Sequence, residues 1–362
     1  MAAFIIKINR VPLLFFTLLV PCLPRAQDKI YDASLIPSAL KSYANAVVRN
    51  QEVTIEVKGL NNVDYRFKEA ITILNENGKS LGSIDVDYDK FQQIKDLKAA
   101  VYDAAGNLIK KLKSGDFEDR SAVPDFSLFQ DDRVKHLLPV AGNYPYTIEY
   151  EYEKKIKQTF YFLPWYPLEA PDIALEKSTY RLIAPNGFPL RVKEFNIEKG
   201  SRQPYGKDQV AYEWHADHLT AQRNEPLSPP LEDYLPMVKI APVKFEYDGI
   251  RGEFSDWQQY GKWVYDNLLD GRDKLPPATV SIVQEMVKNI RSPEEKARRI
   301  YAYMQQRTRY ISVQIGIGGF QPMKAEEVDR LGYGDCKGLV NYTMALLEAA
   351  GIPAYYTEVN AG

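Results

Sequence analysis

The first part of the chain alternates apolar and polar residues with the period of β-strands. Val47–Val57 and Val63–Leu74 are rich in β-branched and aromatic residues, which favour extended structure. In Tyr144–Tyr152 every even-numbered residue is tyrosine or isoleucine, and threonine and glutamate hold the odd positions from Thr147 onward. This run predicts an antiparallel strand with one buried face, and a sandwich core explains the tyrosines better than a carbohydrate-binding surface does.

Further strands are expected at Leu81–Val86, Ala99–Tyr102, Leu108–Leu112, Gln158–Leu163, Ser178–Ile183, Leu190–Ile197, Val210–His215 and Val243–Tyr247. Asn77-Gly78 predicts a tight turn before the first of these, and Asp103–Asn107 predicts a hairpin. Many short strands separated by proline, glycine and asparagine are typical of a sandwich or a related sheet. We therefore expect an antiparallel β-sandwich-like domain over residues 27–248.

After about Gly249 the apolar residues recur with helical spacing. Helices are predicted at Phe254–Leu269, Pro277–Ile290, Ser292–Met304 and Ala325–Arg330, with a short strand at Arg309–Val313. The third helix has a clear start, because Ser292 is followed by proline and two glutamates. The chain is thus expected to be an α+β multidomain protein whose second part covers residues 249–362. Its length of 362 residues and its 45% hydrophobic content suit a globular protein with a real core.

One more helix is predicted to begin at Cys336. The residues that recur on one face of this helix are Cys336, Leu339, Val340, Thr343, Met344 and Leu347. Gly351 and Pro353 would end it, and Ala354–Val359 would follow as a strand.

The N-terminus has the features of a secretory signal. Lys7 and Arg10 precede the apolar run Val11–Leu23, which is too short to cross a bilayer comfortably, and Ala26 offers a cleavage site. We expect residues 1–26 to be removed and the mature protein to be exported to the periplasm or cell envelope. Lipid attachment at Cys22 is the alternative. No other segment approaches the roughly 20 apolar residues of a transmembrane span.

Charge argues against nucleic acid as a partner. The net charge is −2, and loss of the signal removes three cations and takes it to −5. Basic residues alternate with acidic ones and form no stripe.

Loss of the signal would leave Cys336 as the single cysteine of the mature chain. A lone exported thiol forms no internal disulfide. It is therefore either buried as a small hydrophobic side chain or retained for a chemical role. Asp335 is a plausible N-cap for the helix. First-turn N–H groups and the positive end of the helix dipole stabilise a thiolate and an oxyanion. Gly334 and Gly338 would keep the backbone approachable, and Lys337 would add positive charge.

Other candidate groups are less specific. Gln321 or Gln314 could donate an amide N–H to an oxyanion, or could brace the loop instead. His215 and His218 have metal-like spacing, but an offset of three on a strand puts them on opposite faces. The loop at Gly316–Gly319 lacks the Lys-Ser/Thr of a phosphate loop. We expect neither a metal nor a cofactor.

The stretch from about Arg309 to Val359 resembles the transglutaminase-like core, an α/β papain-like fold. The resemblance is carried by Arg309-Tyr310, Gly318-Gly-Phe-Gln-Pro322, Gly334-Asp-Cys-Lys337 and Leu346-Leu-Glu-Ala-Ala-Gly-Ile-Pro-Ala354. It implies that Cys336 is the nucleophile and that a helical N-terminal portion of the core is present. The β region before it resembles a domain of unknown function that precedes such cores in exported proteins of Gram-negative bacteria.

The family pattern also places a histidine and an aspartate some tens of residues after the cysteine. All three histidines, His136, His215 and His218, precede Cys336. A cysteine acyl-transfer site needs a base for the thiol proton. The sequence is therefore expected to be a core that is incomplete at the C-terminus and inactive as it stands. The alternative is that the whole protein lacks the base and that the site is dead.

The expected function is acyl transfer or amide hydrolysis through a thioester on Cys336, with a protein or peptide substrate that includes cell-wall peptide. The alternative is a non-catalytic exported module that binds protein or glycan.

Overall fold

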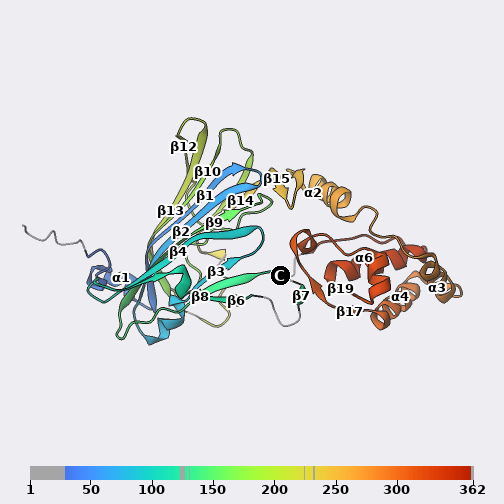
Figure 1. The fold of residues 1–362 in the computed structure, drawn as a ribbon, viewed down its shortest axis with the longest axis horizontal. Helices are drawn as coiled ribbons and strands as arrows, with labels where there is room; N and C mark the ends of the chain where they lie inside the picture. Colours follow the sequence, from blue (N-terminus) through green and yellow to red (C-terminus); the bar gives the residue numbers. More distant parts are fainter. Residues whose placement is uncertain (1–28, 123–126, 130, 224, 231–232, 360–362) are drawn as a thin grey trace, which may run out of the picture.

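The structure is a computed structural model that describes residues 29–122, 127–129, 131–223, 225–230 and 233–359. The expected signal peptide, residues 1–26 with Cys22, lies outside the described residues. A mostly β N-terminal part is followed by a helical part, which lies to one side of it (Figure 1). This confirms the expected α+β class.

Within the described residues the largest sheet has eight strands in the order β12-β13-β10-β1-β2-β9-β4-β5. Their bounds are β1 Ala46–Gly59, β2 Asn62–Ile73, β4 Gln92–Tyr102, β5 Leu108–Lys113, β9 Tyr146–Ile156, β10 Ile173–Pro185, β12 Ser201–Tyr205 and β13 Gln209–Leu219. Neighbours are antiparallel except β1 and β10, which run parallel. A parallel pair needs a long connection, and here residues 60–172, which follow β1 and precede β10, supply it.

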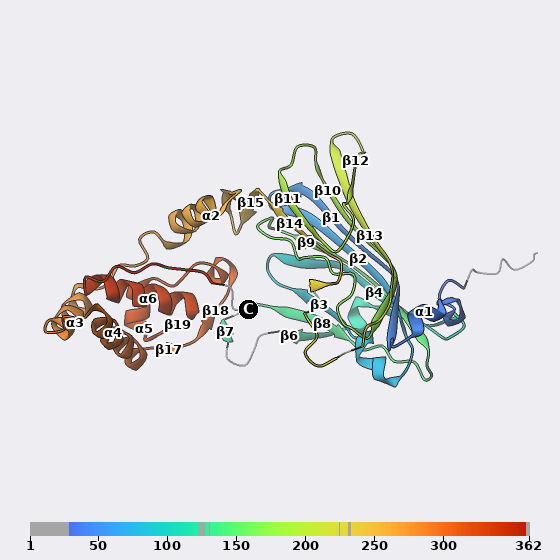
Figure 2. The same ribbon diagram turned by 180° about the vertical axis from the view of Figure 1, so that it is seen from behind.

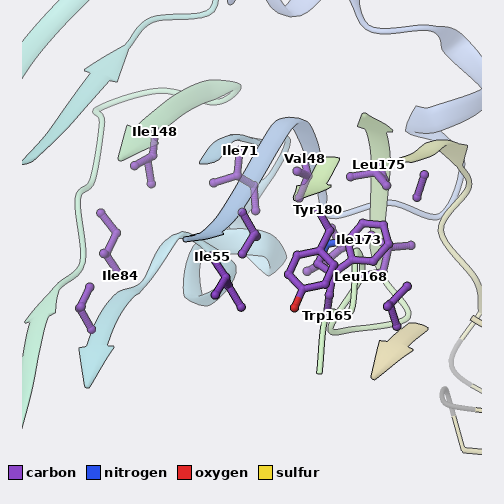
Figure 3. Close-up of a cluster of buried hydrophobic side chains, with 14 of the residues drawn as sticks. Val48, Ile55, Ile71, Ile84, Ile148, Trp165, Leu168, Ile173, Leu175 and Tyr180 are labelled. Carbon is purple, nitrogen blue, oxygen red and sulfur yellow. The ribbon is translucent and has the colours of Figure 1, made fainter. Parts of the chain in front are cut away.

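Smaller sheets lie against this large one (Figure 2). They contain β3 Ile84–Tyr88, β6 Glu118–Ser121 and β8 Arg133–Leu137, then β11 Leu190–Phe195 with β14 Met237–Pro242. A further pair, β15 Lys244–Tyr247 with β16 Ile250–Glu253, packs through Phe245 on Trp263 and Leu268 of the helical part. The core between the layers is aliphatic and aromatic (Figure 3). At its centre the rings of Trp165 and Tyr180 stack with centroids 5.5 Å apart. The layered core agrees with the sandwich-like expectation.

The tyrosine run behaves as predicted on strand β9. Tyr146 and Ile148 are fully buried, and Tyr150 and Tyr152 pack on the same core from its edge. Glu149, on the other face, accepts a hydrogen bond of 2.8 Å from the hydroxyl of Tyr31. Thr147, on the same face as Glu149, is also fully buried and bonds the hydroxyl of Thr72 at 2.8 Å, so this face is covered as well at the start of the strand.

Two strand-level expectations were wrong. Asn77-Gly78 lies in a 3-10 helix, η2 Glu76–Gly82, because Asn75 caps that helix through the N–H of Gly78. Gln158–Leu163 is irregular, because its polar groups bond locally and to distant loops. There the hydroxyl of Thr159 donates to the carbonyl of Leu60 at 2.6 Å.

The helical part contains α2 Trp257–Val264 continued by a π-helical turn η5 Tyr265–Leu269, α3 Pro277–Val287, α4 Pro293–Arg307, η6 Gly316–Gly319, α5 Ala325–Leu331 and α6 Cys336–Ala349. Short strands β17 Arg309–Tyr310, β18 Ser312–Val313 and β19 Tyr333–Gly334 connect them. Shorter elements of the β part are η1 Ala33–Leu35, α1 Ser38–Lys41, η3 Ser114–Asp116 and β7 Ser127–Phe129. As predicted, Ser292 caps α4 by accepting from the N–H of Glu295.

Several contacts join the two parts. Strand β7 of the β part pairs with β18 of the helical part. The carboxylate of Asp248 accepts from the N–H of Ile317 at 2.9 Å and from Lys90 at 3.3 Å. The ring of Phe160 meets that of Phe320 edge-on at 5.1 Å. These contacts hold turn η6 against the β part.

The proposed boundary between residues 248 and 249 stays a prediction, and the hairpin β15–β16 spans it. Among the helices of the described residues, none is long and apolar enough to cross a membrane.

The β core holds one carboxyl group whose titration should be visible in stability. Burial raises the pKa of Glu69 to about 7, and its carboxyl accepts from Gln51 at 2.8 Å and from Tyr150 at 3.2 Å. The folded state therefore keeps a proton that the unfolded chain loses at lower pH. This contribution is fully present below the unfolded pKa of about 4.3 and is lost as pH rises through the folded pKa.

We expect Glu69→Gln to remove the fall in unfolding free energy between about pH 4.3 and 7 that this group causes. Urea denaturation at several pH values, followed by tryptophan fluorescence, measures it. The control is Glu52→Gln on the neighbouring strand β1, where the side chain is exposed. An identical pH profile in Glu69→Gln and wild type would contradict the assignment.

Candidate active site

Helix α6 begins at Cys336 because Asp335 caps it. Asp335 has an extended backbone, and its Oδ1 accepts from the N–H of Gly338 at 2.8 Å. Strand β19 leads into the cap and pairs in parallel with β17. Before it, α5 ends at Gly332 with a φ of +68°, a left-handed conformation that suits glycine. This sharp reversal brings α5 against α6.

The thiol of Cys336 is exposed. The buried-core interpretation of this cysteine is therefore wrong. The predicted face of α6 was wrong as well, since Val340 is 45% exposed and the inner face is built from Gly338, Asn341, Tyr342, Ala345 and Leu346. Those residues pack on α3, α4 and α5, which fixes the rotation of the helix and leaves its first residue at the surface.

Asp335 and Lys337 form an ion pair that is almost withdrawn from water. Their side chains are 2% and 12% exposed. The ammonium of Lys337 therefore neutralises the capping carboxylate of Asp335. Its positive charge is balanced within this pair. The expectation that Lys337 adds free positive charge at the thiol needs this correction. A buried pair of this kind holds its geometry because either charge alone would be costly.

The glycines beside Cys336 serve packing. A Cβ on Gly334 would lie 3.3 Å from Val328 and 3.4 Å from Leu339, and one on Gly338 would lie 3.3 Å from Met323. Their surroundings are filled by protein atoms, so they let α6 approach α5 and the preceding loop. Backbone access for a ligand, which the sequence had suggested, is not what these contacts provide.

Gln321 is engaged in its own loop. Its Oε1 accepts from Arg272, and its Nε2 donates to the carbonyl of Asn267 at 3.3 Å. These bonds give it the bracing role that the sequence left open, and the oxyanion role stays a prediction. Gln314 is exposed beside η6.

Asn341 of α6 holds the segments around Arg272 and Met323 by hydrogen bonds, a role that the sequence did not suggest. Asn341, fully buried, donates from Nδ2 to the carbonyl of Arg272 at 2.8 Å and to that of Met323 at 3.1 Å. Arg272 also donates to the carbonyl of Pro322 at 3.1 Å. A polar residue inside an apolar helical face gives no local signal of such a role.

A second network of polar contacts joins four helices, α3, α4, α5 and α6. Asp329 on α5 accepts from the hydroxyl of Tyr342 at 2.7 Å and from that of Thr279 at 2.9 Å. Arg307 lies 3.6 Å from the same carboxylate. Burial, and then Asp329, raise the pKa of Tyr342 well above its ordinary value. The phenol therefore stays protonated and acts as a fixed donor.

Tyr356 is the aromatic group beside the thiol that sequence reasoning missed. Burial, and then the negative charges of Glu358, Cys336 and Asp335, raise the pKa of Tyr356 to about 12. The expected strand Ala354–Val359 was wrong, because these residues pair with no strand of the described chain. The segment nevertheless returns along α6 and brings Tyr356 near Cys336.

The histidines lie elsewhere. His136 is on β8 and bonds Asp85 at 2.7 Å, while His215 on β13 bonds Glu213 at 2.9 Å. His218 ends the same strand region, exposed. Over the residues that the structure describes, no group of three or more His, Cys, Asp or Glu is placed to hold a metal ion.

Comparisons with known proteins agree with this architecture. Residues 61–223 match the model of DUF3857, a domain of unknown function with a solved structure, and residues 280–360 match that of the transglutaminase-like superfamily. The chain thus joins a DUF3857 domain to a transglutaminase-like core segment. Among curated proteins, none matches the chain.

A solved structure has the same arrangement. It is a "putative protease" from Parabacteroides distasonis, with a TM-score of 0.63 and 15% identity, and the match covers 85% of this chain and 59% of that one. The chain therefore spans about three fifths of that protein's length, and at this identity the likeness concerns the fold alone. An aminopeptidase A from Legionella pneumophila, with a TM-score of 0.31 and 12% identity over 68% of this chain and 27% of its own, carries no argument.

The cap and the ion pair can be separated by substitution. Asp335→Asn keeps a capping acceptor but leaves Lys337 unpaired, so we expect a loss of about 3 kcal/mol of unfolding free energy. Asp335→Ala should cost about 1 kcal/mol more, because the cap is lost too. Denaturation followed by far-ultraviolet circular dichroism measures both.

Ser292→Ala, which removes only the cap of α4, is the matched control and should cost about 1 kcal/mol. Replacing Lys337 by Met in the Asp335→Asn background should recover most of the loss. If Asp335→Asn costs no more than Ser292→Ala, the ion pair is not what stabilises the start of α6.

Proposed function

We propose that this chain is part of an exported cysteine-dependent acyltransferase or amidase in which Cys336 is the nucleophile. The observation that carries the proposal is an exposed thiol on the first residue of a firmly capped helix. The match of residues 280–360 to the transglutaminase-like superfamily supports it. A protein or peptide substrate, cell-wall peptide included, fits the arrangement that this chain shares with a protein described as a protease.

The chemistry follows from the position of the sulfur. The thiolate attacks the acyl carbon of an amide, and the carbonyl oxygen takes up the negative charge. Unpaired first-turn N–H groups of α6 are the donors at hand for that oxyanion. Collapse forms the thioester and expels the amine, which takes the proton that the thiol gave up. Water then releases an acid, or a second amine forms a new amide.

A base must carry the thiol proton to the leaving amine. The three histidines lie on or beside β8 and β13, away from α6 in the sequence and in the fold. The base is therefore a group other than these three histidines. Export to the periplasm or cell envelope, directed by residues 1–26, is part of the proposal.

Alkylation tests whether the helix start activates the thiol. In a Cys22→Ser background Cys336 is the single cysteine. We expect iodoacetamide to modify native Cys336 several-fold faster than the same thiol in the unfolded chain, because the helix N-terminus favours the thiolate.

The matched control is a cysteine one turn further along the same helix, Val340→Cys with Cys336→Ser, at a site that is 45% exposed. That thiol should react like a free one. If it reacts as fast as Cys336, the special position of Cys336 has no chemical effect.

Acyl transfer itself is tested with an activated aryl ester of a short peptide, whose leaving group needs no proton. We expect a hydroxylamine-sensitive adduct with the mass of the acyl group on Cys336, detected by mass spectrometry, and none in Cys336→Ser. Fast alkylation without any adduct would favour the non-catalytic binding module.

A further inference from the structure

A hollow of about 560 Å³ lies beside the second half of α6. One wall is formed by α2 and η5, and the other by the segment from Ala354 to Glu358. The far end of α6 contributes Met344 and Glu348. Tyr356 lines the hollow, and the charge of Cys336 is among those that raise the pKa of Tyr356.

The walls of the hollow carry aromatic rings that are open to solvent. Trp257 is 82% exposed, Tyr265 is 58% exposed and Tyr355 is 87% exposed. Tyr260 stands beside Trp257, with ring centroids 5.8 Å apart. Exposed aromatic faces that border one hollow suit a ligand that stacks on them or a cation that sits over a ring.

The charge of the hollow is of one sign. Asp270, Asp273, Glu348 and Glu358 line it, and no lysine or arginine does. Within the described residues none of these four carboxylates takes part in an ion pair. Glu358 accepts from the hydroxyl of Tyr260 at 2.7 Å, which holds the segment against α2.

The carboxylates that line the hollow repel one another. Burial, and then the charge of Asp273, raise the pKa of Glu348 above its ordinary value. A cation in the hollow would relieve this repulsion, whereas an anionic group would increase it.

We infer that this hollow binds the positively charged side chain, of the lysine, arginine or diamino-acid type, of a peptide substrate whose bond Cys336 attacks. The inference rests on the proposed function, because it names the substrate class of that same site. Aromatic walls alone would also accept a neutral sugar. The four carboxylates favour a cationic side chain over a neutral sugar. An anionic glycan is disfavoured by the same charges.

Binding is measured with the full chain carrying Cys336→Ser, so that no chemistry takes place. The probe is a short capped peptide with one lysine, and the matched probe is the same peptide with N-acetyl-lysine. Titration calorimetry, or quenching of Trp257 fluorescence, should show at least a tenfold tighter Kd for the lysine peptide. The difference should shrink as salt is raised.

The variant Asp273→Asn with Glu348→Gln should bring the lysine peptide to the affinity of the acetylated one. Trp257→Ala should weaken both peptides. The matched control is Glu285→Gln on α3, an exposed carboxylate outside the hollow, which should change neither affinity. Thermal unfolding of each variant checks that the fold is kept.

Equal affinity for the two peptides, tighter binding of the acetylated one, or no measurable binding of either would overturn the inference. These outcomes are independent of the thiol, because the variant lacks it. Conversely, an inert Cys336 in the alkylation and acylation assays would overturn the proposed function and leave the peptide affinities unchanged.

Discussion

A carboxylate withdrawn from water fixes the start of helix α6. Asp335 accepts from the N–H of Gly338 and holds Lys337 in an ion pair, so neither the cap nor the lysine can swing toward solvent without leaving a buried charge unpaired. The residue between them, Cys336, is left exposed at the start of the helix. The position of the thiol is therefore set by its two neighbours.

The rotation of α6 about its axis is a second constraint, and it comes from the other helices. Asn341 clamps the preceding loop through two backbone carbonyls, and Tyr342 donates to Asp329 on α5. Turning the helix to bury Cys336 would break both sets of bonds. Breaking them would leave the buried Nδ2 of Asn341 and the hydroxyl of Tyr342 without acceptors, which costs more than apolar contacts gain. On the other side, Asp248 of the β part holds turn η6.

Most local structure could be predicted from the sequence because its signals are local. Ser292 before proline and two glutamates marks the start of α4, and alternation from Tyr146 to Tyr152 marks the buried face of β9. The motif around Cys336 and the helical spacing after it placed the start of α6 correctly. The Asn77-Gly78 turn failed because Asn75 offers its side chain to the same N–H groups, and so a short helix replaces the hairpin.

What could not be predicted depends on partners far apart in the chain. Apolar spacing chose a face of α6 containing Val340, whereas the buried face contains Asn341 and Tyr342, whose partners lie on other elements. The parallel pairing of β1 with β10 has no local signal either. Tyr356 is similar, because a segment expected as a strand reaches the thiol only by folding back along α6.

The balance of charge differs between the start of α6 and the hollow. Lys337 neutralises Asp335, whereas the carboxylates of the hollow have no cation of their own among the described residues. A thiolate at Cys336 would add a further negative charge to that side of the helix, and the helix N-terminus offsets it only locally. Met344 and Glu348 of the hollow lie about 12 and 18 Å further along α6 than Cys336, beyond the roughly 8–10 Å over which charges act in salt, so a cationic side chain there would act mainly through the affinity for the substrate.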